Sequence, residues 1–141
     1  MAATVVVVDG IGGGIGAQLV ERLHRELADQ VSIVALGANA VATQRMVDAG
    51  ADRGASGENA VCVTAPTADF ILGPIGIVLP NAMMGEITPR MAEAVLSAGG
   101  RKLLLPLSQP HVTIVGISPK NVSDLIGEAI HLLRQALARP G

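Results

Sequence analysis

The segment from residue 5 to residue 23, VVVVDGIGGGIGAQLVERL, constrains the fold more than any other part of the chain. Its four valines are typical of a strand that is buried on both faces of a parallel sheet. Five glycines then fall within positions 10–16, and apolar residues at helical spacing follow them. Because each glycine raises the entropy lost on folding, bare backbone must be needed where the strand passes into the helix.

The rest of the chain alternates between strand-like and helix-like patterns. We expect further strands over 31–36, 53–55, 69–72, 102–107 and 112–117, and helices over 15–28, 40–49, 57–64, 88–97 and from 118 or 123 to 138. The run at 61–63 is equally compatible with a strand. Only four residues join the last two strands, which predicts an antiparallel C-terminal hairpin. The sequence therefore predicts one three-layer, Rossmann-like α/β domain over residues 1–141, with a mostly parallel sheet.

Composition excludes several classes of protein. Charged residues make up 16% of the chain, the net charge is −2, and there is one Phe with no Trp or Tyr, so neither a basic face nor stacking platforms indicate nucleic acid. A single cysteine and three scattered histidines predict no metal site. The charge-free run at 70–85 contains prolines and is too short to span a membrane. We expect a soluble cytoplasmic protein.

The glycines match the fingerprint of a dinucleotide-binding loop. Residues 12–17 read G-x-G-x-x-A, between a predicted strand and a predicted helix. In such a loop one glycine makes the turn, a later one lets a phosphate approach the backbone, and free amides at the helix start face the anion. The alternative is a tight strand-to-helix turn that binds nothing.

Read from Gly10, the spacing G-x-x-x-G-I-G resembles the loop of short-chain dehydrogenases. That family carries a catalytic Tyr and Lys, whereas this chain has no Tyr and is too short for the family's substrate region. The acidic residue that holds the adenosine ribose, about 20 positions past the loop, is missing, because residues 36–39 read L-G-A-N. Asn39 could bond a ribose hydroxyl, and no arginine is available for a 2′-phosphate unless Arg45 reaches back. The loop also has no lysine, which argues against triphosphate hydrolysis.

We therefore expect a nucleotide or dinucleotide, with NAD or NADP favoured, at the edge formed by the loops that follow the strands. The carboxylate of Asp9 would repel a phosphate, so its favoured role is to hold the turn through backbone amides. The predicted binding residues come from three of these loops: Asp9, Gly10, Ile11, Gly12, Gly13, Gly14, Ile15, Gly16, Gly37, Asn39, Gly73, Pro74 and Gly76.

Three functions stay open. The first is a binding module that acts as a sensor, a carrier or a subunit of an oxidoreductase. The second is a stand-alone small-molecule enzyme that uses Glu86, Glu58 or Asp9 as acid or base. No catalytic residue is assigned, because the chain lacks the tyrosine, a nucleophile elbow and a metal cluster. The third is a structural oligomer without a ligand.

Taken as a whole, the chain resembles a family of short, functionally uncharacterised bacterial proteins. The resemblance covers nearly all of it and is carried by VDGIGGGIG, ALGANAVAT, AGADRGASGENAV and GPIGIVLPNAMMGEITPRMAEA. It implies a Rossmann-like unit. Ile11 stands where the family usually has glutamine.

The apolar segment at 75–84 predicts self-association. Its sequence is too irregular for a core helix, and large exposed apolar patches usually mark interfaces. We expect a homodimer or homotetramer that buries part of this segment, so that Ile77→Asp weakens assembly.

Overall fold

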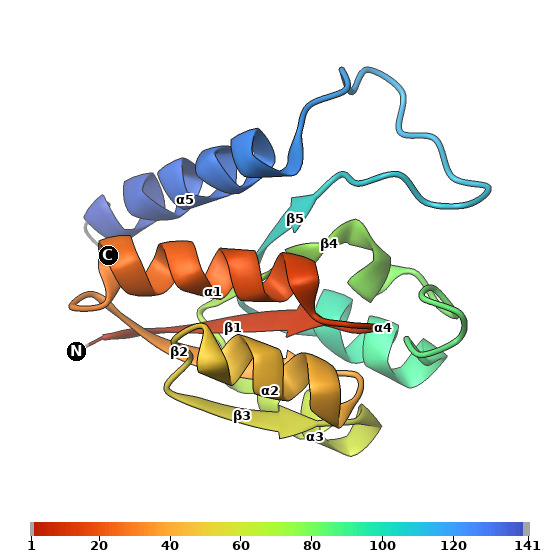
Figure 1. Cartoon of the computed structure of the whole chain (residues 1–141), viewed down its shortest axis with the longest axis horizontal. Coiled ribbons are helices and arrows are strands. Elements are labelled where there is room, and N and C mark those ends of the chain that lie inside the picture. Colours follow the sequence, from red (N-terminus) through yellow and green to blue (C-terminus); the bar gives the residue numbers. More distant parts are fainter. Residues whose placement is uncertain (1, 140–141) are drawn as a thin grey trace.

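Strands and helices alternate along the chain, as predicted (Figure 1). The computed structural model describes residues 2–139. The strands are β1 (Ala3–Asp9), β2 (Val31–Gly37), β3 (Arg53–Ser56), β4 (Phe70–Pro74) and β5 (Arg101–Leu105). The helices are α1 (Gly14–Leu27), α2 (Ala40–Asp48), α3 (Glu58–Thr64), α4 (Pro89–Ser97) and α5 (Val122–Ala138), with 3₁₀ turns η1 (Ala65–Thr67) and η2 (Ile75–Val78).

The five strands form one sheet in the order β3-β2-β1-β4-β5, and every neighbouring pair is parallel. The chain builds outward from β1 in one direction and then returns to build outward from β4 in the other. The loops after β1 and β4 therefore leave the sheet toward opposite faces. In open parallel sheets this switch point, at the carboxyl ends of the strands, is where ligands bind.

Both faces of the sheet are covered, which gives the three layers that the sequence predicts. Val5 and Val7 point into one core, which is completed by α1, α2 and α5. Val6 and Val8 point into the other core, which is completed by α3 and α4 (Figure 1). All four valines are almost completely buried, so the uniform valine run reflects a strand with no solvent-facing side.

The shortest elements also form where the sequence predicts them. β3 pairs with β2, and the residues of the ambiguous run at 61–63 lie in α3. Asn39 and Thr88 cap α2 and α4 by accepting backbone amide hydrogens, as their positions before these helices predict. Within residues 2–139, no helix combines the length and the apolar character needed to cross a bilayer.

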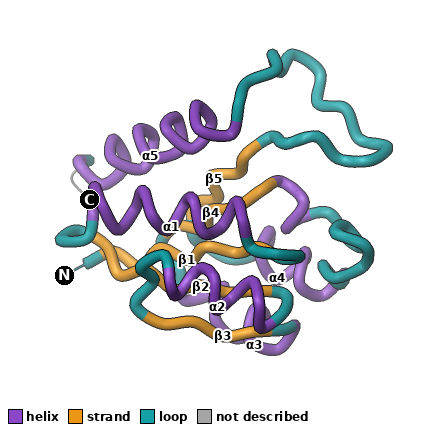
Figure 2. Tube along the Cα trace, viewed as in Figure 1, coloured by secondary structure: helices purple, strands orange, loops and turns teal. Residues whose placement is uncertain are grey.

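The predicted C-terminal hairpin is wrong. β5 lies parallel to β4, and residues 112–117 form no strand, with only an isolated antiparallel bridge between Gln109 and Val112. Pro106 follows β5 directly, and proline cannot donate a hydrogen bond to a strand ladder. The segment between β5 and α5 instead extends away from the sheet as an irregular loop, in which Val115 is 93% exposed (Figure 2).

The segment at 75–84, which the sequence predicts to take part in assembly, is partly buried within the domain. Ile77 is fully buried in the core beneath α4, whereas Met84 is 98% exposed. Gly76 and Ile77 therefore pack within the domain, whereas Pro80, Asn81 and Met84 are exposed. Consequently Ile77→Asp tests the stability of the fold and gives no information about assembly.

We expect Ile77→Ala to lower the free energy of unfolding by about 2–5 kcal/mol, because it leaves a cavity in a fully packed site. Val115→Ala, in the exposed loop, should change it by no more than about 0.5 kcal/mol. Urea unfolding followed by circular dichroism measures both variants. Equal effects would show that the loop is packed as tightly as the core.

Candidate functional site

The glycine loop is held closed by the carboxylate at the end of β1. Asp9 is only 4% exposed, and its two oxygens accept hydrogen bonds from backbone amides at both ends of the loop. Oδ1 accepts from Gly10 N at 2.8 Å, and Oδ2 accepts from Gly16 N at 2.7 Å. This geometry fits the turn-holding role that the sequence favours for Asp9.

Burial raises the pKa of Asp9 above its ordinary value of 3.8, because a charged carboxylate loses its hydration there. The hydrogen bonds from Gly16 and Gly10 oppose this shift, since they stabilise the ionised form. The nearby Glu86 carboxylate raises the pKa further, and the Arg45 guanidinium lowers it. The loop thus encloses a carboxylate whose ionisation responds to the charges around it.

Packing within the protein explains three of the five loop glycines. Gly13 has a φ of 71°, and a Cβ there would lie 2.8 Å from the backbone of Ala42. At Gly16 a Cβ would lie 2.5 Å from the sulfur of Met46, and at Gly10 it would lie 2.7 Å from a carboxylate oxygen of the loop after β4. These three positions require glycine because other parts of the chain occupy the space.

The other two glycines, Gly12 and Gly14, have room for a Cβ. A Cβ at Gly12 would come no closer than 3.8 Å to the guanidinium of Arg45, and one at Gly14 no closer than 3.5 Å. Both distances are ordinary van der Waals contacts with the end of a flexible side chain. Nothing in residues 2–139 therefore requires glycine at these two positions.

Three backbone amides of the same loop have no acceptor within the described part of the chain: those of Gly12, Gly14 and Ile15. They lie at the start of α1, whose N-cap residue Gly13 supplies no side-chain hydrogen bond. Unbonded amides at a helix start form a concave anion site, and the helix dipole adds partial positive charge there. A hollow of about 320 Å³ opens over them, lined by residues 9–15 together with Gln18, Pro74 and Met83.

In the loop after β2, the side-chain amide of Asn39, which the sequence offers as a partner for a ribose hydroxyl, is bonded within the protein. The side-chain oxygen of Asn39 accepts from Ala42 N at 2.9 Å and so caps α2. Its Nδ2 group donates to Ile11 O at 2.8 Å and to Glu86 Oε2 at 2.7 Å. Both donors of Asn39 are therefore used within the protein.

Like Gly16 and Asn39, three further predicted residues lie outside the hollow, and each is packed against other parts of the chain. A Cβ at Gly37 would collide with Thr43, whose hydroxyl accepts the Gly37 amide hydrogen at 3.1 Å. A Cβ at Gly73 would collide with the backbone of the neighbouring β1. Gly76 lies beside the side chain of Gln109, 3.3 Å from where its own Cβ would be. Of the predicted residues after β4, only Pro74 lines the hollow.

The structure adds three residues that were not predicted to bind. Gln18 lies one helical turn after Gly14, so helical spacing alone could have identified it. Arg45 does reach back from α2, and its Nη1 donates to Gly12 O at 3.3 Å. Met83 also lines the hollow, but no local pattern marks it, because its position depends on how the loop after β4 folds.

The candidate acids and bases do not converge on one point. Glu86 is half-buried and accepts from Ile11 N, beside the hollow, whereas Glu58 forms a surface ion pair with Arg90 at 3.4 Å. Asp9 uses both oxygens to hold the loop. Within residues 2–139, no three His, Cys, Asp or Glu side chains gather as a metal site would require.

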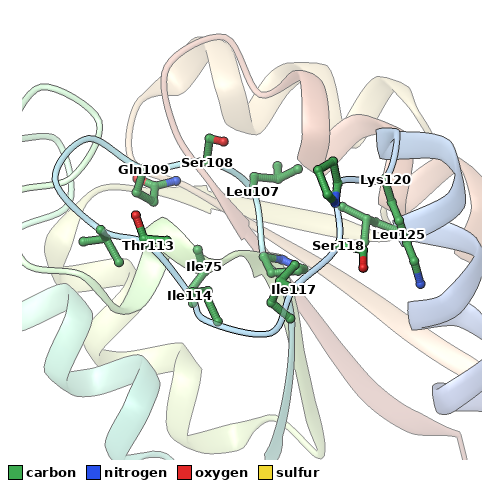
Figure 3. Close-up of a pocket in the computed structure, with 13 residues that line it drawn as sticks. Ile75, Leu107, Ser108, Gln109, Thr113, Ile114, Ile117, Ser118, Lys120 and Leu125 are labelled. Atoms are coloured by element: carbon green, nitrogen blue, oxygen red, sulfur yellow. The ribbon is translucent and has the colours of Figure 1, made fainter.

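A second cavity, of about 490 Å³, lies beyond the ends of β4 and β5 (Figure 3). Ile75, Leu107 and Leu125 give it an apolar wall, while Gln109 and Ser118 add polar groups. The loop that replaces the expected hairpin supplies most of its lining. Pro74 lines the hollow at the glycine loop and the next residue, Ile75, lines this cavity, so both spaces lie at the carboxyl end of β4.

The parallel sheet, its strand order and the glycine loop that leads into α1 define a Rossmann-like α/β domain. The chain belongs to the family described as domain of unknown function (DUF3842), whose model matches residues 4–138. No curated protein matches the chain. The family match runs from β1 to the last residue of α5 and so includes the whole site.

Two glycine substitutions should distinguish a loop position where a side chain collides with the protein from one where it fits. Gly13→Ala should lower the free energy of unfolding by about 1–3 kcal/mol, because alanine is strained at positive φ and meets the backbone of Ala42. Gly14→Ala should be neutral or add about 0.4–1 kcal/mol, because its backbone accepts alanine and the unfolded chain loses entropy. Urea denaturation of the two variants tests this, and a large loss for Gly14→Ala would contradict the openness of that position.

The raised pKa of Asp9 predicts a dependence of stability on pH. The folded protein holds this proton more tightly than the unfolded chain, so the contribution of Asp9 is largest at low pH and falls as the pH rises above 3.8. In Asp9→Asn the amide NH₂ cannot accept one of the two backbone hydrogens, which should cost about 1–3 kcal/mol.

The free energies of unfolding of wild type and Asp9→Asn, measured from about pH 4 to pH 8, should therefore converge as the pH rises. A gap that widens toward neutral pH would mean that the ionised carboxylate is favoured in the fold. That result would reverse the assigned direction of the pKa shift.

Proposed function

We propose that this domain binds an adenine dinucleotide, NAD(H) or NADP(H), and serves as a sensor, a carrier or a subunit of an oxidoreductase. One observation carries the proposal: Gly12 and Gly14 leave space that the protein does not use, next to backbone amides that have no acceptor. Glycine costs folding entropy, so its presence there is best explained by a ligand that must approach the backbone closely. A phosphate has the required size and charge.

The charges around the loop support an anion bound by backbone amides. The dipole of α1 points its positive end into the hollow, and the guanidinium of Arg45 lies beside Gly12 and Gly14. The carboxylate of Asp9 is directed at the loop itself, because its two oxygens accept hydrogen bonds from the amides of Gly10 and Gly16. A phosphate would thus meet donors and one arginine, with no lysine in the loop.

The cavity beyond β4 and β5 supports a ligand with two halves. It lies, like the hollow at the glycine loop, at the carboxyl end of β4. In open parallel sheets the two halves of a dinucleotide bind on either side of the switch point at this edge, which supports the assignment. Its apolar wall with a few polar groups suits a heteroaromatic ring (Figure 3). A mononucleotide would leave this space unused, which favours the dinucleotide.

Gly14→Val should weaken dinucleotide binding at least about tenfold, because the side chain would fill the space above the free amides. Isothermal titration calorimetry with NAD⁺ and NADP⁺ measures the effect, and wild type should bind the better ligand with a dissociation constant of about 1 μM or weaker. Arg45→Gln should weaken binding by a smaller factor, because it removes one partly exposed charge.

Gly99→Val provides the matched control. Gly99 has open space where its Cβ would lie and follows α4, outside both cavities. This variant should bind as wild type does. If wild type binds neither cofactor, or if Gly14→Val binds as tightly as wild type, the loop has only a packing role.

A further inference from the structure

The end of β2 carries no acidic residue of its own, but a carboxylate from another part of the chain reaches the loop that follows it. In dinucleotide-binding domains an Asp or Glu near this point bonds the adenosine ribose hydroxyls. Here Asn39 occupies the loop after β2, and its Nδ2 group lies 2.7 Å from Oε2 of Glu86. Glu86 comes from the loop after β4, 47 residues further along the chain.

The loop that carries Glu86 is folded so that it holds this carboxylate in place. Asn81, Met83 and Met84 all have positive φ, between 58° and 68°, a conformation that is costly for residues other than glycine. Backbone hydrogen bonds across the loop maintain it, among them Asn81 N to Ile87 O at 2.7 Å. Strain of this kind persists only where the surrounding structure fixes it.

The carboxylate of Glu86 bridges the loop after β1 and the loop after β2. Oε1 accepts the amide hydrogen of Ile11 in the glycine loop, and Oε2 accepts from Asn39 after β2. An ionised carboxylate has about four acceptor positions, so each oxygen keeps capacity for one more donor. A ribose diol offers two such donors.

We propose that Glu86 is a specificity-determining residue, which binds the ribose hydroxyls of the adenosine half and selects a ligand without a 2′-phosphate. This inference rests on the proposed dinucleotide function. A 2′-phosphate would place negative charge against Glu86 and near Asp9, and neither carboxylate is exposed enough for water to screen the repulsion well. It would also remove one of the two hydroxyl donors.

Arg45 does not offset this repulsion in the proposed arrangement. Its guanidinium lies beside Gly12 and Gly14, on the side of the glycine loop where the pyrophosphate would bind. Glu86 lies instead between Ile11 and Asn39. The two charged side chains thus divide the ligand between them, with Arg45 toward the pyrophosphate and Glu86 toward the ribose.

Calorimetric titration of wild type and Glu86→Gln with NAD⁺ and NADP⁺ tests the proposal. Wild type should bind NAD⁺ at least about tenfold more tightly than NADP⁺. Glu86→Gln should weaken NAD⁺ binding and reduce the preference to less than about threefold, because the neutral side chain no longer repels a 2′-phosphate. Glu93→Gln, an exposed change on α4, is the matched control and should retain the wild-type ratio.

A second measurement needs no variant and decides the matter if Glu86→Gln does not fold. Wild type should bind adenosine 5′-monophosphate more tightly than adenosine 2′,5′-bisphosphate, again by about tenfold. Equal binding, or tighter binding of the bisphosphate, overturns the role of Glu86 and leaves the dinucleotide function standing. The same holds if Glu86→Gln keeps the wild-type preference, whereas binding of no adenine nucleotide at all removes the proposed function itself.

Discussion

The site depends on one buried carboxylate that accepts hydrogen bonds from both ends of the glycine loop. Asp9 bonds the amides of Gly10 and Gly16 and so ties the two ends of the loop together, while the amides of Gly12, Gly14 and Ile15 between them have no acceptor in the described part of the chain. The bond to Gly16 N also satisfies a donor that α1 would otherwise leave unpaired in its first turn. Without Asp9 the loop would lose the constraint that fixes the positions of its unbonded amides.

The fold was largely predictable because its signals are local and mutually consistent. The valine run, the helical spacing after it and the capping residues before α2 and α4 each indicate an element that the structure contains. The prediction of a strand at 112–117 was wrong because it gave more weight to the β-branched residues there than to the prolines around them. Strand propensity depends on having a neighbouring strand to pair with, and Pro106 ends the ladder before one can form.

The site was predictable only where it follows the sequence order. Residues 9–15, which the sequence predicts as binding residues, all line the hollow, because a strand, a loop and a helix in succession fix their positions. Sequence patterns could not show that Glu86 reaches Ile11 and Asn39, since those contacts join segments 75 and 47 residues apart. Sequence patterns also could not distinguish the glycines packed against other parts of the chain from those with room for a Cβ, because this depends on where Ala42 and Met46 lie.

The irregular loop between β5 and α5 affects how much conformational entropy binding in the second cavity would cost. Its walls come mostly from a loop that belongs to no sheet or helix and exposes Val115 to water. A ligand that fixes such a loop must offset the conformational entropy of ordering it, about 1–2 kcal/mol for each backbone residue immobilised. The glycine loop is held by the two hydrogen bonds of Asp9, whereas the loop that lines the second cavity belongs to no sheet or helix, so under the proposed function binding in the second cavity would carry the larger ordering cost.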